Sequence, residues 1–116
     1  MKVKIEKLGQ ESLLFSDGYM LQSVHESDCC EHHWLDFEHI KLDDFEGLEF
    51  DLSHDNFFER IDGYGIQLNP IKGLPVRIAG YGSNNGYYSS NLNLEVYKDN
   101  KLIKTYDITE CQNISD

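Results

Sequence analysis

Short stretches of alternating apolar and polar residues dominate this chain, and turn residues separate them every few positions. A period of two places successive side chains on opposite faces of a β-strand. Asp17-Gly18 and Lys98-Asp99-Asn100-Lys101 are typical hairpin turns, because Asp, Asn and Gly tolerate positive φ angles. The pattern predicts strands over residues 3–5, 12–15, 19–24, 29–40, 57–68, 76–79, 87–97 and 102–108.

Strands joined by tight turns favour a mainly β domain with an antiparallel sheet, either closed as a barrel or packed as a sandwich. One short helical turn is expected at Lys41–Gly47, and a larger helical part would make the fold α+β. Gly63 and Gly65 predict a bend within the strand over residues 57–68. We expect irregular loops at residues 49–56 and 80–85.

With 116 residues and 40% hydrophobic content, the chain is long enough and apolar enough for one domain with its own core. We expect that domain to span residues 1–111 and to end in a frayed tail, residues 112–116. The alternating charges of the first eight residues are unlike a signal peptide, and no stretch approaches the ~20 apolar residues of a membrane span. These features predict a cytoplasmic protein, and its three cysteines do not suggest a disulfide framework.

The acidic charge is concentrated in one third of the chain. Residues 25–62 contain 13 of the 21 acidic residues, only two basic residues and all five histidines, so this window accounts for the whole net charge of −11. Charge of this sign repels phosphates, which argues against direct nucleic-acid binding. It suits cation binding or docking onto a basic protein surface, although an inert solvated face has the same composition.

The run from His25 to His33 is rich in groups that bind Zn²⁺, which prefers imidazole, thiolate and carboxylate ligands. Strand alternation places Cys30 and His32 on one face, with His25 and Asp28 preceding the strand. We therefore predict a candidate zinc set of His25, Asp28, Cys30 and His32. The run matches neither a paired C-x-x-C nor H-E-x-x-H, so a core cysteine flanked by surface histidines is the alternative.

Two catalytic hypotheses are weaker. A cysteine nucleophile needs a thiolate, and the carboxylates beside Cys29 and Cys30 would raise the thiol pKa. Paired carboxylates occur by chance among 21 acidic residues, so they do not indicate glycoside hydrolysis. We predict no catalytic residues and expect a protein without enzymatic activity.

A second run, Gly80 to Ser90, combines Gly, Asn, Ser and Tyr, which is common in recognition loops. It lacks the lysine of a phosphate-binding loop. Its bland alternative is a simple hairpin loop. Together with the edge around residues 29–33, it predicts an interaction surface formed by Glu31, His33, Asn84, Asn85, Tyr87 and Tyr88.

The Asp28-Cys29-Cys30-Glu31 run and the later Ser83-Asn-Asn-Gly-Tyr-Tyr-Ser89 run resemble signatures of an uncharacterised family of small phage and prophage proteins. The resemblance extends in order over roughly residues 19–94. It implies a phage, prophage or bacterial origin. It also implies that the cysteine run and the tyrosine loop meet in space.

Three functions follow as hypotheses. The first is an acidic intracellular protein-interaction module with a basic protein partner, no membrane partner and homo-oligomer formation as a further option. The second is a divalent-metal domain that uses the His25–His33 region to bind zinc. The third is a mimic of DNA charge that inhibits a host DNA-binding protein.

Overall fold

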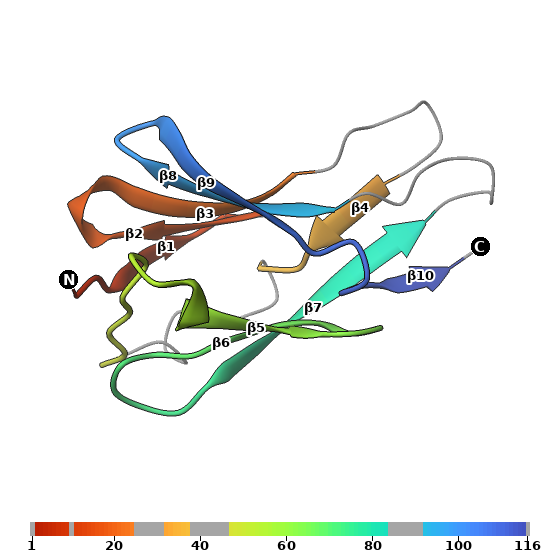
Figure 1. Cartoon of the computed structure of the whole chain (residues 1–116), viewed down its shortest axis with the longest axis horizontal. Helices are drawn as coiled ribbons and strands as arrows, with labels where there is room; N and C mark the ends of the chain where they lie inside the picture. Colours follow the sequence, from red (N-terminus) through yellow and green to blue (C-terminus); the bar gives the residue numbers. More distant parts are fainter. Residues whose placement is uncertain (1, 10, 25–31, 38–46, 84–91, 116) are drawn as a thin grey trace.

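The protein is mainly β and forms two packed sheets. The computed structural model describes residues 2–9, 11–24, 32–37, 47–83 and 92–115. In Figure 1 the strands β1, β2, β3, β8 and β9 lie in one layer, and β5, β6, β7 and β10 lie in the other, with β4 beside β7. The mainly β class is confirmed, and of the two alternatives left open by the sequence the arrangement is sandwich-like, since the sheets of the described residues do not close into a barrel.

The first sheet has the strand order β1-β2-β3-β8-β9, and all its neighbours are antiparallel. Both of its predicted tight hairpins are present. Asp17 has a φ of +62°, and Asp99 and Asn100 have φ of +52° and +67°, as the turn chemistry requires. The bounds are β1 Ile5–Leu8, β2 Ser12–Phe15, the 3₁₀ turn η1 Ser16–Gly18, β3 Tyr19–Val24, β8 Asn93–Lys98 and β9 Lys101–Asp107.

The second sheet has the order β10-β7-β6-β5, and β4 also pairs with β7. Residues 76–79 of β7 pair with β6, and residues 80–83 pair with β4. The C-terminal strand β10 runs parallel to β7 beside residues 81–83. The bounds are β4 His32–Leu35, β5 Phe58–Ile61, β6 Gly65–Leu68, β7 Val76–Ser83 and β10 Asn113–Ser115.

Residues 48–57, which we call the strap, pass between the sheets and end in the 3₁₀ turn η3 Asp55–Phe57. Phe50 exchanges two backbone hydrogen bonds with Val3 beside β1, at one edge of the first sheet. Lys104 of β9, at the opposite edge, donates to the carbonyl of Ser53. The strap therefore reaches from one edge of the first sheet to the other.

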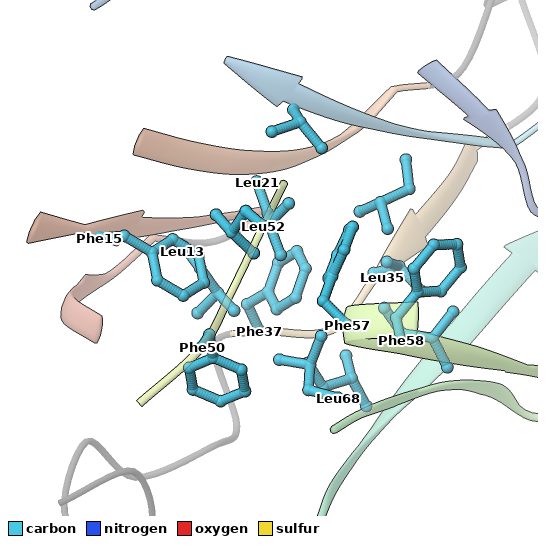
Figure 2. Close-up of a cluster of buried hydrophobic side chains, with 14 of the residues drawn as sticks. Leu13, Phe15, Leu21, Leu35, Phe37, Phe50, Leu52, Phe57, Phe58 and Leu68 are labelled. Atoms are coloured by element: carbon cyan, nitrogen blue, oxygen red, sulfur yellow. The ribbon is translucent and has the colours of Figure 1, made fainter. Parts of the chain in front are cut away.

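The core lies between the two layers and the strap. Figure 2 shows Leu13, Phe15 and Leu21 of the first sheet facing Leu35, Phe58 and Leu68 of the second. The strap adds Phe50, Leu52 and Phe57, all nearly inaccessible to solvent. Burying side chains of this size contributes about 1.5–3 kcal/mol each, so the strap is a structural element of the fold.

Three expectations from the sequence need correction. Residues 57–68 form the hairpin β5–β6, with Gly63 at a φ of +73° in its turn, and not one bent strand. Residues 80–83 belong to β7, where a loop was expected. Residues 113–115, predicted as part of a frayed tail, pair with β7 as β10.

Other expectations are less directly tested. Within the described ranges, β4 ends at Leu35 because the Phe37 amide turns back to the Leu35 carbonyl, so the strand predicted over residues 29–40 is shorter there. Residues 41–46 of the expected helical turn lie outside the described residues. No helix in the part of the chain that the structure describes is long and apolar enough to cross a membrane.

Candidate functional site

The two sequence runs singled out above are attached to neighbouring positions of the fold. Residues 25–31 connect β3 to β4, and residues 84–91 connect β7 to β8. In the first sheet Val24 pairs with Asn93, and in the second sheet His32 pairs with Ser83. The strand ends before and after one connection therefore pair with the strand ends after and before the other, so both connections are attached at the same end of the sandwich. We call this the β4–β7 end.

An aromatic pair marks this end. Trp34 of β4 lies directly opposite Tyr81 of β7, and their ring centroids are 5.7 Å apart. Strand alternation points both rings away from the core, because the next residue, Leu35, is completely buried. Tyr81 is 37% exposed. The β4–β7 end thus presents a preassembled aromatic surface.

Hydrogen bonds from both layers fix β4 in place. The buried Leu35 amide donates to the Ser23 hydroxyl of β3 at 3.2 Å, which links the second sheet to the first. On the other side, the Asp36 amide donates to the Ala79 carbonyl of β7 at 2.8 Å. The aromatic pair therefore stands on a backbone that is held from two directions.

Gly80 allows the C-terminal segment to pass close behind this end. A Cβ atom at Gly80 would lie 2.3 Å from the Cys111 carbonyl oxygen. Cys111 itself is completely buried, and burial raises the pKa of its thiol. This cysteine is accordingly a core residue and a poor nucleophile.

An open groove of about 430 Å³ lies beside Cys111, between the end of β9 and the β5–β6 hairpin. Asp62, Asp107 and Glu110 give it three carboxylates. Thr109 donates two hydrogen bonds to Asp107 and lowers the pKa of that carboxyl, while Arg60 donates to the Asp107 carbonyl at 2.9 Å. The described residues that line the groove include no histidine and no exposed thiol.

Comparison with known proteins identifies the family. The sequence profile of a family described as Domain of unknown function (DUF7448) matches residues 1–94. The chain belongs to this family. No curated protein and no solved structure matched in the same comparisons. The match agrees with the expected membership of an uncharacterised family.

The zinc prediction concerns residues of which the structure describes little. His25, Asp28 and Cys30 lie outside the described residues, and for His32 the structure describes only its backbone in β4. Within the described ranges, His, Cys, Asp and Glu side chains form no group of three that would hold a metal ion. The zinc set stays a prediction.

The predicted interaction surface has a similar status. Glu31, Asn84, Asn85, Tyr87 and Tyr88 lie outside the described residues. The backbone of His33 pairs with Gly82, which places this position next to the aromatic pair. The sequence contained a signal for Trp34, since it alternates with Leu35, but not for its pairing with Tyr81, which depends on long-range register.

Lysines of the first sheet and its lead-in partly neutralise the acidic residues that the structure describes within residues 25–62, which we call the acidic window. Glu49 lies 3.9 Å from the Lys2 ammonium, and Asp55 lies 3.3 Å from Lys104 and accepts a hydrogen bond from Tyr106 at 2.7 Å. Asp51 accepts hydrogen bonds from Ser53, which lower the pKa of its carboxyl. These strap carboxylates thus stabilise local structure as well as adding charge.

Proposed function

We propose that this chain is a non-enzymatic protein-interaction module of phage, prophage or bacterial origin that acts in the cytoplasm. The partner binds at the β4–β7 end. The observation that carries the proposal is the outward-facing Trp34–Tyr81 pair on a doubly anchored backbone.

The chemistry of the pair supports this role. Tyrosine and tryptophan are enriched at the centres of protein interfaces, because they bury a large area at a low cost in side-chain entropy. The rings are already packed against each other, so binding need not order them first. An aromatic centre of this kind supplies affinity without any reacting group.

The rim of the proposed interface comes from the two flanking runs. Glu31 and His33 precede Trp34 by three positions and by one position, and Asn84, Asn85, Tyr87 and Tyr88 follow β7. The chain has a net charge of −11, so a basic partner surface would be attracted and steered onto it.

A bait experiment tests the proposal. The purified protein and its Tyr81→Ala variant are immobilised and exposed to bacterial lysate at several ionic strengths, and retained proteins are quantified by mass spectrometry. Tyr64→Ala is the matched control, because Tyr64 is 42% exposed but lies in the β5–β6 turn. A captured partner is then purified and titrated against all three proteins.

We expect one partner whose affinity falls at least about 10-fold in Tyr81→Ala and stays unchanged in Tyr64→Ala. Circular dichroism confirms that both variants are folded. The proposal fails if no protein is enriched over the Tyr81→Ala bait at any salt concentration, or if both variants bind the partner equally.

Zinc binding and DNA mimicry remain predictions with their own measurements. Elemental analysis of protein purified without chelator or nickel decides the first, and less than about a tenth of an equivalent of metal eliminates it. Competition between this chain and duplex DNA for a basic DNA-binding protein decides the second.

A further inference from the structure

The outer face of the first sheet carries an apolar row that crosses four strands. Leu14 pairs with Met20, Met20 with Tyr97, and Tyr97 with Leu102. Directly paired residues on one face of a sheet have Cβ atoms about 4.5–5.5 Å apart, so these four side chains form a continuous line. Ile103, which is left unpaired at the register shift next to Leu102, is also exposed.

The row faces solvent. Its members alternate with Leu13, Leu21 and Val96, which are completely buried in the core. Leu14 is 38% exposed and Leu102 is 46% exposed. Leu14, Met20 and Tyr97 also line a groove of about 360 Å³ on this face. A contiguous exposed apolar surface in an otherwise charged protein indicates a contact site.

The charge of this part of the chain indicates what contacts it. Residues 2–24 and 93–107, which form the first sheet and its lead-in, contain six acidic residues and six lysines. The whole net charge of −11 therefore belongs to the remainder of the chain. Two copies would therefore repel each other less through this sheet than through the rest of the chain.

The geometry of the row also suits a second copy. A two-fold axis lying in the plane of the contact superposes the row on its counterpart, which gives an isologous interface. The Tyr97 hydroxyl donates a hydrogen bond to the Glu95 carboxylate at 2.7 Å, and this bond restricts the Tyr97 side chain before any contact forms.

The size of the face sets the expected affinity. Five strands at about 4.8 Å spacing and about 20 Å of strand length give a flat footprint of about 400 Å² per copy. Two rugged faces of this size bury about 1,000 Å² in total, the lower end for a specific interface. The contact is therefore weak, with a Kd on the order of 10–100 μM.

We propose that two copies of this chain form a symmetric dimer through the outer face of the first sheet, with the Leu14–Met20–Tyr97–Leu102 row at its centre. This surface lies on the opposite layer from the Trp34–Tyr81 pair. The dimer consequently displays two partner-binding ends, and its existence does not depend on the proposed function.

Sedimentation equilibrium between about 5 μM and 1 mM tests the dimer. The full-length protein is compared with Leu14→Glu and Leu102→Glu, which place carboxylates at the two ends of the row. Leu74→Glu is the matched control, because Leu74 is 82% exposed in the β6–β7 connection. Circular dichroism and thermal melting establish that each variant is folded.

We expect a concentration-dependent dimer whose Kd rises at least about 10-fold in Leu14→Glu and in Leu102→Glu but not in Leu74→Glu. A wild-type protein that stays monomeric at about 1 mM overturns the proposal. So does a dimer that survives Leu14→Glu and is lost only in Leu102→Glu, which would indicate edge pairing through β9. Equal loss in all three variants overturns it as well.

If Leu14→Glu does not fold, Leu14→Gln makes the same comparison, because glutamine is similar in size to glutamate and adds no charge. Tyr81→Ala distinguishes the two proposals: it should leave the dimer unchanged while weakening partner binding. Loss of partner binding while the dimer persists, or loss of the dimer while partner binding persists, shows which of the two surfaces the substitution affects.

Discussion

The two sheets share one core but differ in how their strands are arranged and in the charge of the segments that connect them. The first sheet consists of antiparallel neighbours, and its residues and lead-in balance six acidic residues with six lysines. The second sheet joins the consecutive strands β5, β6 and β7 to β4 and to the parallel strand β10. Its strands contain only Glu59, Arg60 and Arg77 as charged residues, and most of the acidic residues lie in the connections within residues 25–62.

This difference separates two kinds of information in the sequence. Alternation determines which side chains face the core, and it does so in both sheets. Charge has little influence on the fold, but it determines which surfaces can approach each other. An apolar row on a sheet whose segments balance in charge suits self-association, whereas an acidic region with exposed aromatics suits a different, basic partner.

The largest expected effect concerns the close packing of backbone in the second sheet. A Cβ atom at Gly65 would lie 1.9 Å from the Ile78 carbonyl oxygen of β7, so Gly65→Ala forces β6 and β7 apart. We expect a loss of more than about 3 kcal/mol in the free energy of unfolding, measured by urea denaturation.

Gly63→Ala is the matched control for Gly65→Ala. Nothing lies within 4 Å of a Cβ atom at Gly63, but its φ is +73°. The cost there should be only about 1 kcal/mol, from the left-handed conformation alone. Equal losses in the two variants would show that steric contact with β7 is not what makes this sheet sensitive.

The next effect measures the coupling between the sheets. Ser23→Ala removes the hydroxyl that accepts a hydrogen bond from the Leu35 amide, and it leaves that buried N–H without its acceptor. We expect a loss of about 1–2 kcal/mol in the free energy of unfolding. Ser12→Ala, on the outer face of the first sheet, should change it by less than about 0.5 kcal/mol.

If Ser23→Ala also changes the tyrosine fluorescence or partner affinity of the folded protein, the sheets are coupled beyond stability. An unchanged stability would instead mean that the Leu35 amide finds another acceptor. In that case β4 is held to the sandwich by its pairing with β7 and not by the first sheet.

Local features were predictable from the sequence, and long-range ones were not. Asp17-Gly18 and Asp99-Asn100 specify their hairpins within a few residues, so both were predicted correctly. The Asp62-Gly63-Tyr64 turn lies inside a continuous strand-like run, so the sequence alone predicts a bend where the structure has a hairpin. The mainly β fold class followed from alternation alone.

The strand β10 shows why other parts could not be predicted. Its residues are mostly polar, and its place beside β7 depends on the missing side chain of Gly80, some 30 positions earlier in the chain. The candidate site has the same limitation. Trp34 and Tyr81 are each visible in the sequence, but their contact follows from the pairing of β4 with β7.

A smaller expected effect concerns the stability of the protein at acidic pH, which depends on hydrogen bonds between the strap and the first sheet. Tyr106 and Lys104 donate hydrogen bonds to Asp55 and lower the pKa of that carboxyl below its ordinary 3.8. The folded state therefore keeps Asp55 charged at lower pH than the unfolded state does. This contribution is present above about pH 4 and is lost as the pH falls through the lowered value.

We expect Asp55→Asn and Tyr106→Phe each to reduce the decline in the free energy of unfolding between about pH 5 and pH 3, measured by urea denaturation at each pH. Asp51 and Asp107 have lowered pKa values from hydrogen bonds to Ser53 and Thr109, so a part of the decline should remain. A decline identical to wild type in both variants would remove Asp55 as a source of acid sensitivity.

The smallest expected effect concerns the exposed ion pair between the first sheet and the strap. Lys2 is 71% exposed, and its ammonium lies 3.9 Å from the Glu49 carboxylate. Solvent screens such a pair, so Lys2→Gln should change the free energy of unfolding by less than about 0.5 kcal/mol. Val3→Ala, one residue away and completely buried, should cost about 2 kcal/mol.

A larger loss in Lys2→Gln that disappears at about 0.5 M salt would mean that the lysines of the first sheet offset repulsion in the acidic window. The charge difference between the first sheet and residues 25–62 would then contribute to folding as well as to recognition.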